Sequence, residues 1–410
     1  MSVVIRPIED GELEQFLRTM GGPFAFDLPE EDEKREAMLE RFGSVFETDR
    51  TRCAFEDGEM IGTLGAFSLA MTTPGGTVDC AGTTMVTMSA AHRRQGHLRR
   101  MMGAHLDESR ERGDPIAALW ASDSAIYGRF GYGLASVEIR REIDPAHVRF
   151  HRRAPDGDTV GFVSADEAAD LLPDVYSRVL PTRPGMYARS EDWWRHRRLR
   201  DAPEARRGAT AFRYAVSHDE HGTPSGYAQY RVKTDWDLHG EHEVRVSELL
   251  STSPSAEAGL WRVVLGHDLA GTVRASTPPD GGLVDLLDGP RRATGKLVDA
   301  LWVRLLDIPA AFAARRYSAE GSVTVAVHDP VDGSVASFRI ESDGDTGTAT
   351  ATRDDPDIEL DVEDLGAAYL GRARLRRLAA AGRLWGDSAA LATLDRMLTW
   401  DPQPWCPEVF

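Results

Sequence analysis

Residues 85–102 read MVTMSAAHRRQGHLRRMM, and this stretch decides the fold of the chain around it. An apolar run ends at Met88 and gives way to a short loop that contains two arginines and a glycine. Beyond the loop, Leu98, Met101 and Met102 recur at the spacing of one helix face. The stretch therefore predicts a strand, a loop and a helix that runs from about residue 97 to residue 112.

The loop has the features of an anion site. Backbone N–H groups at a helix N-terminus have no partner within the helix and attract negative charge. Gly96 lets the backbone approach a phosphate closely, and Arg93 and Arg94 add charge and forked donors that suit a pyrophosphate. The GxxxxGK(S/T) pattern of a P-loop is absent. Charge runs are often solvated surface, so a basic turn without a ligand stays open.

The composition limits the classes of protein that fit. The chain has 410 residues, too many for one typical core, which predicts about two to four domains. Lys and Arg number 48 against 66 Asp and Glu, a formal net charge of −18. Nucleic-acid binding needs a basic surface, so this balance argues against a general nucleic-acid binder. Binding of a cationic partner stays open, and so does the alternative that the acidic residues only keep the protein soluble.

Other compositional signals concern metals and membranes. Three cysteines lie far apart without CxxC spacing, so we expect neither a zinc site nor a disulfide framework. Acids occur by residue 9 with no apolar h-region, so we expect no signal peptide and a cytoplasmic protein. No run of 18 apolar residues exists, so we expect no membrane span. Four histidines among acids fit surface positions better than a metal site: His218, His221, His239 and His242.

The order of patterns along the chain predicts three units. The first is mixed α/β, with strands over residues 53–89 and 116–122 and an alternating strand at 137–143. The second contains a strand, loop and helix at 244–270 in the same order as the opening stretch, but without arginines in its loop. We interpret it as a degenerate duplicate that lost the anion site, although a coincidental match stays open. The third begins with a helix over 296–309, followed by strands and two further helices.

Two motifs carry a resemblance to known proteins. The segment V-T-M-S-A-A-H-R-R-Q-G-H-L resembles the acetyl-CoA-binding motif of the GNAT superfamily of N-acetyltransferases, whose backbone amides hold the coenzyme pyrophosphate. The segment I-Y-G-R-F-G-Y-G at 126–133 resembles the signature of one branch, the enhanced intracellular survival (Eis) acetyltransferases. Two departures are Ala90, where relatives often carry proline, and Met88, where valine is usual. Ala90 should alter the rigidity of the loop. Met88 should still contact the coenzyme through its backbone.

The resemblance implies an α/β (α+β) architecture of three domains. Residues 1–150 would form an N-terminal acetyltransferase domain that binds acetyl-CoA, and residues 151–293 a degenerate acetyltransferase-like domain. Residues 294–410 would form a sterol-carrier-like domain that supplies the terminal carboxylate. The family forms homohexamers, as trimers of dimers, so the resemblance implies the same assembly here.

The resemblance also assigns residues to the coenzyme. The strand end would lie along the pantetheine arm, as an added strand pairs with an exposed edge, and the loop would surround the pyrophosphate. The strand end after residues 116–122 would add further contacts. The implied coenzyme residues are Val86, Thr87, Met88, Arg93, Arg94, Gln95, Gly96, His97, Leu98, Arg99, Ser122 and Asp123.

Two further residues would carry the chemistry. Tyr127 would be the general acid, because a phenol of ordinary pKa ~10 can protonate the departing thiolate. The alternative for Tyr127 is a packed aromatic, and Tyr132 in the same motif is the second choice of acid. The family's base is the C-terminal carboxylate, here that of Phe410, for which a frayed tail is the alternative. No metal is implied.

The implied reaction moves acetyl to primary amines of polycationic, aminoglycoside-like small molecules and also to lysine side chains. A cationic acceptor favours acidic and aromatic walls, for which the candidates are Phe24, Phe26, Asp27 and Glu408, with solvated surface as the open alternative. The rival interpretation is a non-catalytic coenzyme- or lipid-binding protein that uses the sterol-carrier-like domain. The intact loop, Tyr127 and Phe410 argue against that rival, because a binding protein has no need of all three.

Overall fold

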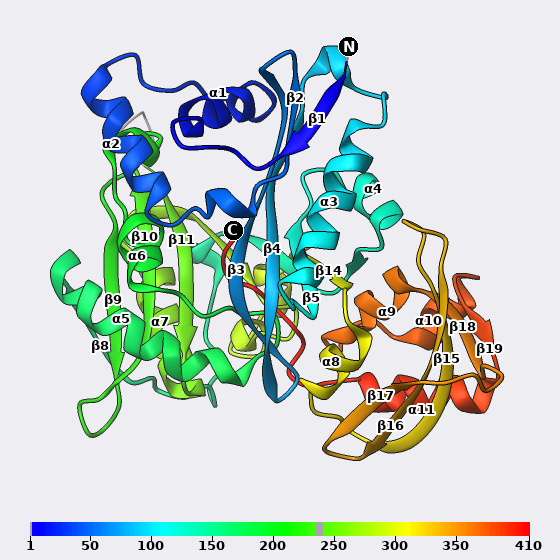
Figure 1. Ribbon diagram of the computed structural model, residues 1–410. Helices are drawn as coiled ribbons and strands as arrows, with labels where there is room; N and C mark the ends of the chain where they lie inside the picture. The colour runs from blue at the N-terminus through cyan, green and yellow to red at the C-terminus, as the bar shows by residue number, and fades with distance from the viewer. Residues whose placement is uncertain (1, 235–240) are drawn as a thin grey trace. The chain divides into compact units, whose positions relative to one another are not determined.

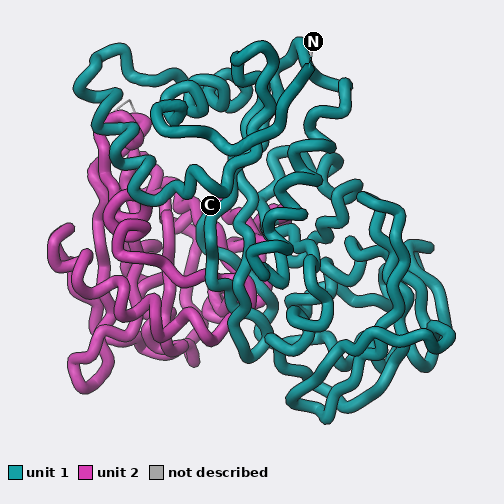
Figure 2. The backbone as a smooth tube through the Cα atoms, viewed as in Figure 1, with its two compact units in different colours: residues 1–136, 300–410 teal, residues 137–299 magenta. Residues whose placement is uncertain are grey.

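The structure is a computed structural model that describes residues 2–234 and 241–410 (Figure 1). The chain divides into two compact units, which Figure 2 shows in different colours: unit 1 comprises residues 1–136 and 300–410, and unit 2 comprises residues 137–299. Of the four histidines expected at the surface, His221 is exposed, whereas His242 is buried and His239 lies outside the described residues. Among the helices of the described residues, none has both the length and the apolar character needed to cross a bilayer.

The first sheet of unit 1 holds the opening stretch. Its seven strands lie in the order β1-β2-β3-β4-β5-β14-β6, and β4 and β5 are parallel while the other neighbours are antiparallel. The strands are β1 (Val3–Arg6), β2 (Cys53–Glu56), β3 (Glu59–Thr73), β4 (Gly76–Met88), β5 (Ile116–Trp120), β6 (Gly133–Leu134) and β14 (Leu301–Leu305).

Helices cover both faces of this sheet (Figure 1). On one face α1 (Leu13–Phe24) packs through Phe16, whose ring lies 5.0 Å from that of Phe46, and α2 (Asp32–Gly43) follows it. On the other face α3 (His97–Glu111) buries Met101 and Met102 in the core with Leu64 and Ala117. The helix expected at 97–112 is therefore present, with its apolar stripe toward the sheet.

Unit 2 repeats the order of the first sheet. Its strands lie in the order β8-β9-β10-β11-β12-β7-β13, and the parallel pair β11 and β12 takes the place that β4 and β5 hold in unit 1. Trp261 of α7 is buried in the core of this unit. The elements are β7 (Val137–Ile143), β8 (Thr159–Val163), β9 (Arg213–His218), β10 (Pro224–Lys233), β11 (His242–Ser251), β12 (Ala270–Thr277), β13 (Gly295–Asp299), α5 (Ala165–Val179), α6 (Glu191–Trp193) and α7 (Pro254–Leu265).

The two sheets do not divide at the predicted boundaries near residues 150 and 294. β7 was expected in the first domain, but it lies in the second sheet between β12 and β13. β14 follows the second unit in sequence, yet it fills the matching place in the first sheet, between β5 and β6. Alternation along a strand shows which residues share a face, and it carries no information on which sheet the strand joins.

The third domain lies within unit 1 and has a five-stranded sheet in the order β17-β16-β15-β18-β19. β15 and β18 are parallel, and the other neighbours are antiparallel. Helices α9 and α11 contact β15. The elements are β15 (Glu320–His328), β16 (Val335–Asp343), β17 (Gly347–Ala351), β18 (Ile358–Asp361), β19 (Trp385–Gly386), α8 (Ile308–Ala313), α9 (Val362–Tyr369), α10 (Leu375–Ala380) and α11 (Ser388–Leu398).

The helix predicted over residues 296–309 is wrong. These residues form β13, then β14, and only the start of α8. All five residues of β14 are buried, because the strand lies inside the sheet with a partner on each edge. A short apolar run that is buried on both faces has no periodicity that separates a strand from a helix.

Candidate active site

A break in strand pairing opens the site. β4 pairs with β5 from Cys80 to Gly82, and its pairing with β3 shifts register between Thr63 and Gly65. Met85 lies at this irregularity with a left-handed φ of 54°. The Thr63 hydroxyl donates to the Met85 carbonyl oxygen at 2.8 Å, which fixes the bulge. A bulge re-aims the residues that follow it, and here these are Val86, Thr87 and Met88.

The loop after β4 turns tightly into α3. Arg94 and Gly96 adopt left-handed φ angles of 64° and 84°, and Gly96 is the N-cap of α3. No side chain caps this helix, so its first backbone N–H groups are available to a ligand. The 15 residues of α3 give these N–H groups the positive end of a helix dipole. This geometry matches the anion site that the loop sequence predicts.

A short turn follows the end of β5. The Asp123 carboxylate accepts a hydrogen bond from the Ala125 N–H at 3.0 Å and caps α4 (Ser124–Tyr127). Tyr127 ends this helical turn, and its carbonyl oxygen accepts from the Tyr132 N–H at 3.3 Å. We call residues 123–131 the Tyr127 turn.

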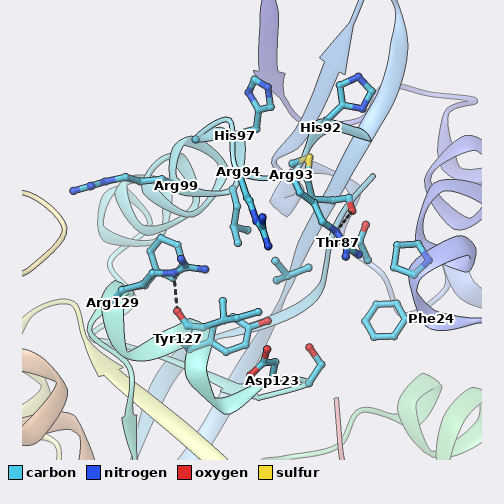
Figure 3. A pocket seen from close by; sticks show the side chains of 18 of the residues that line it. Phe24, Thr87, His92, Arg93, Arg94, His97, Arg99, Asp123, Tyr127 and Arg129 are labelled. Carbon is cyan, nitrogen blue, oxygen red and sulfur yellow. Dashed lines mark hydrogen bonds between the residues drawn. The ribbon is translucent and has the colours of Figure 1, made fainter. Parts of the chain in front are cut away.

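These segments surround a cavity of about 1040 Å³ in unit 1. Figure 3 shows Arg94 pointing into the cavity toward Tyr127, while Phe24 lies on the side away from Arg129. The lining residues are Pro23, Phe24, Val86, Thr87, Met88, His92, Arg93, Arg94, Gly96, His97, Leu98, Arg99, Ser122, Asp123, Ile126, Tyr127, Arg129, Phe130 and Pro330.

The cavity is basic in an acidic protein. Among the described residues that line it, four are arginines and two are histidines, whereas Asp123 is the one acidic residue. The Glu56 carboxylate lies 3.1 Å from His92 Nε2 at the edge of this group of side chains. The whole chain carries a formal charge of −18, so this concentration of positive side chains is local. A cavity of this charge favours an anionic ligand with several phosphates.

The two tyrosines of the signature have different surroundings. Tyr127 borders the cavity, and burial raises the pKa of its phenol above the ordinary value, with a hydrogen bond to Ser122 acting in the opposite direction. Tyr132 is fully buried, and its hydroxyl lies 2.9 Å from the Thr83 hydroxyl. The two rings meet edge to face at 6.2 Å, so Tyr132 supports the ring of Tyr127 from the core.

Phe410 is buried on β4. Its side chain is 5% exposed, and the Thr84 hydroxyl donates to its main-chain oxygen at 3.0 Å. Trp405 and Cys406 are also buried, so this segment packs against the protein rather than fraying. Phe410 is not among the residues that line the 1040 Å³ cavity, although Thr84 lies two residues before Val86 of its wall.

The structure brings most of the predicted coenzyme residues together in one cavity. The exception is Gln95, whose side chain is exposed and donates to the Ala91 carbonyl oxygen at 3.2 Å. Of the four acceptor candidates, Phe24 lines the cavity, while Phe26, Asp27 and Glu408 do not. Asp27 is exposed on the loop between α1 and α2.

Several lining residues were missed by the sequence analysis. Arg129 and Phe130 lie inside the quoted I-Y-G-R-F-G-Y-G motif, and the basic side chain of Arg129 was a usable signal. Pro330 comes from the third domain, in the turn between β15 and β16. No local pattern connects it with residues 85–102, because its place depends on how the third domain packs within unit 1.

Comparison with domain families agrees with this architecture. Two models of an acetyltransferase (GNAT) domain match residues 4–135 and 185–305, and a model of a sterol carrier protein domain matches residues 308–407. The expectation of two tandem acetyltransferase-like domains before a sterol-carrier-like domain is therefore confirmed. The second acetyltransferase match covers residues 185–299 of unit 2 and continues into β14, and it supports the interpretation of that unit as a duplicate over a coincidental pattern.

Individual relatives are similar over nearly their whole lengths. An uncharacterised N-acetyltransferase of Streptomyces coelicolor is 37% identical over 404 residues, 96% of this chain and 95% of that protein. The N-acetyltransferase Eis of Mycobacterium tuberculosis is 34% identical over 399 residues, 95% of this chain and 94% of that protein. The crystal structure of Eis1 from Mycobacterium abscessus has a TM-score of 0.85 at 27% identity, covering 99% of this chain and all of that one.

These relatives are named as enzymes, which decides against the rival of a non-catalytic binding protein. With matching domains in the same order and identity above 30% along almost the full length, the chain belongs to the Eis family of GNAT N-acetyltransferases, enzymes that use acetyl-CoA.

Proposed function

We propose that this acetyltransferase binds acetyl-CoA in the cavity between β4, α3 and the Tyr127 turn and acetylates primary amines of polycationic small molecules. The observation that carries the proposal is the basic cavity with Tyr127 on its wall, in a chain of formal charge −18. The acidic protein would attract aminoglycoside-like cationic amines, whereas the basic cavity would attract the anionic coenzyme. Lysine side chains present the same amine chemistry.

The coenzyme would be held by three kinds of contact. The backbone N–H groups at the start of α3, with Arg93 and Arg94, would bind the pyrophosphate. Val86, Thr87 and Met88 would lie along the pantetheine arm as one edge of a sheet. Ser122 and Asp123 would contact the same arm from the end of β5.

Tyr127 would act as the general acid. An acid must hold its proton until the thiolate departs, and the raised pKa of the buried phenol keeps it protonated at neutral pH. Tyr132 is less suited to this role, because its hydroxyl is bonded to Thr83 inside the core. The preference for Tyr127 within the signature motif thus rests on access to the cavity.

The carboxylate of Phe410 would act as the base that accepts the proton of the attacking amine. Its support is the buried packing of the Phe410 ring and the hydrogen bond from Thr84, which would hold the carboxylate in one place. Amine and acetyl-CoA would be bound together, and the amine would attack the acetyl group directly. Phe24 would form one wall of the acceptor site, with Phe26, Asp27 and Glu408 as further candidates.

Two wider proposals follow from the family. Because acetyl-CoA is the co-substrate, we place the reaction in the cytoplasm, where this thioester is made. We also propose that the chain assembles as a homohexamer, a trimer of dimers, which its mass in solution tests.

The test is thiol release from acetyl-CoA with a panel of amines, for the full chain, Tyr127→Phe and a chain that lacks Phe410. Aminoglycosides and polyamines should release thiol with the full chain. We expect both variants to lose about a hundredfold or more in kcat, because each lacks a proton-transfer group. Affinity for coenzyme A should stay within about threefold, since neither group holds the pyrophosphate.

Different outcomes separate the parts of the proposal. If no amine releases thiol while coenzyme A binds, the acceptor class is wrong. If removal of Phe410 leaves kcat unchanged, the base assignment fails while the acid assignment stands or falls on Tyr127→Phe. A variant that loses coenzyme affinity as well has lost the fold of the site, which melting temperature reveals.

A further inference from the structure

The turn between β15 and β16, residues 329–334, brings the third domain to the coenzyme cavity. Pro330 of this turn lines the cavity, and the Val331 carbonyl oxygen accepts a hydrogen bond from Arg99 Nη2 at 3.0 Å. Arg99 itself lines the cavity from the first turn of α3. The 329–334 turn is therefore part of the cavity wall, although it lies far from residues 85–102 in the sequence.

Asp329 joins this turn to the rest of unit 1. Its carboxylate accepts from Arg304 Nη2 at 2.5 Å, and Arg110 Nη2 of α3 lies 3.6 Å away. The other carboxylate oxygen accepts from the Val331 N–H at 3.0 Å, which fixes the turn itself. One side chain thus contacts the turn, β14 and α3.

Arg304 carries the connection to the Tyr127 turn. Its side chain is 0% exposed, and its Nη1 donates to the Phe130 carbonyl oxygen at 2.6 Å. An arginine without solvent needs a counter-charge, because a lone buried charge is strongly destabilising. Asp329 supplies that charge, and its own side chain is 16% exposed.

The guanidinium of Arg304 packs closely against the Tyr127 turn. A Cβ on Gly131 would lie 2.0 Å from Arg304 Nη1, so the guanidinium rests against the backbone of the Tyr127 turn. Phe130 and Tyr127 both line the cavity and are three residues apart. A shift of Arg304 would therefore move the segment that carries the phenol.

We propose that the Asp329–Arg304 pair is a positioning device by which the third domain holds the Tyr127 turn, and that the 329–334 turn forms part of the coenzyme site. The inference rests on the proposed role of Tyr127. It gives the sterol-carrier-like domain a task in catalysis through residues that do not touch the reacting atoms. A phenol displaced by a fraction of an ångström transfers its proton less well, because proton transfer depends on hydrogen-bond reach.

The test compares Asp329→Asn with Asp345→Asn. The first substitution keeps the shape of the side chain and removes the charge that Arg304 needs. Asp345 is the matched control: it lies in the turn between β16 and β17 of the same domain, is exposed, and pairs with Arg316 Nη1 at 3.1 Å. In Asp329→Asn we expect kcat to fall about tenfold, with the KM for the amine within about twofold.

A second readout separates positioning from stability. We expect Asp329→Glu, which keeps the charge, to recover most of the kcat that Asp329→Asn loses, while Asp345→Asn stays at the level of the unchanged protein. The alkaline arm of the kcat profile should shift in Asp329→Asn, because the surroundings of the Tyr127 phenol change. A loss of fold alone would lower the amount of active protein and leave the pH profile where it is.

The proposal is overturned if kcat of folded Asp329→Asn stays within twofold, or if Asp345→Asn loses as much. Should the unchanged protein release no thiol, the proposed function fails but the positioning device is still testable. Amide exchange of residues 126–131 should then be faster in Asp329→Asn than in Asp345→Asn, with coenzyme A bound to both. Equal exchange in the two variants would refute the device independently of activity.

Discussion

Gly133 shows at the residue scale why the signature I-Y-G-R-F-G-Y-G needs its glycines. A Cβ at this position would lie 1.8 Å from the Glu363 carbonyl oxygen and 2.5 Å from the Ala367 nitrogen, both in α9 of the third domain. A Cβ on Gly131 would lie 2.7 Å from the Val362 side chain of α9, and a Cβ on Gly128 would lie 3.0 Å from the Glu363 carboxylate. The motif is thus the surface on which the third domain packs, as well as the segment that carries Tyr127.

This close approach predicts that Gly133→Ala is destabilising. The added methyl meets backbone atoms that cannot rotate away, so we expect a loss of about 3 kcal/mol in unfolding free energy. Gly103→Ala is the control, because a Cβ there has open space and the residue lies inside α3. That change should be neutral or raise stability by up to about 1 kcal/mol. Thermal melting compares the two, and equal midpoints would contradict the packing described for Gly133.

At the scale of elements, α3 combines a ligand-facing start with a buried titratable group. His105 is fully buried, and its Nε2 lies 2.8 Å from the Thr83 hydroxyl, which in turn contacts Tyr132. Burial lowers the pKa of His105 to about 3, with the charges of Arg50 and Arg52 acting in the same direction. The folded protein therefore holds this imidazole neutral at pH values well above 3.

The pKa shift of His105 predicts a loss of stability in mild acid. The unfolded chain binds a proton near pH 6.5 and the folded chain only near pH 3, so the unfolded state binds more protons between these values. The contribution of His105 to the unfolding free energy is complete above about pH 6.5. Protonation of this group alone lowers the unfolding free energy by about 2 kcal/mol between pH 7 and pH 5. Denaturation of the protein and of His105→Gln at both pH values measures the difference. Identical pH slopes would show that His105 does not contribute.

The elements that could be predicted from the sequence are those whose conformation is set by residues close together in the chain. The strand, loop and helix of residues 85–112 were predictable, because alternation, glycine and helical spacing are local signals. β14 was not, because Leu301–Leu305 is a short apolar run whose conformation is decided by its partners β5 and β6. Likewise, no residue pattern in β7 or β14 indicates which of the two sheets each strand joins.

The same limit applies to the candidate site. The loop and strand-end residues that line the cavity lie in contiguous motifs, so a resemblance could carry them over one by one. Arg304 and Asp329 lie outside any motif and reach the Tyr127 turn only through tertiary packing. A buried arginine inside an apolar run such as ALWVRLL is the one sequence signal that could have pointed to a specific partner.

At the scale of the whole molecule, charge is divided unevenly. The chain has a formal charge of −18, and yet the cavity wall carries Arg93, Arg94, Arg99 and Arg129. The negative surroundings should repel an anionic coenzyme at long range, and the cavity must attract it at short range. Contacts at short range are screened less by salt than the long-range field is.

We therefore expect Arg94→Gln to weaken coenzyme A binding by about tenfold, because it removes a charged hydrogen-bond donor that points into the cavity. Arg396→Gln in α11 of the third domain is the matched control and should leave the dissociation constant unchanged. Isothermal titration of coenzyme A into each variant, carried out at two salt concentrations, gives the dissociation constants of the two variants. Equal affinities for the two variants would place the pyrophosphate elsewhere.

The exchanged strands have a consequence for how the polypeptide is made. Residues 137–299 contain every strand of their own sheet, so this unit can be complete as soon as it has left the ribosome. The first sheet waits for β14, which is synthesised after the whole of unit 2, and until then β5 has a free edge. Such edges invite pairing between chains. The middle of the chain is thus a segment that can be expressed alone, whereas residues 1–136 by themselves should aggregate.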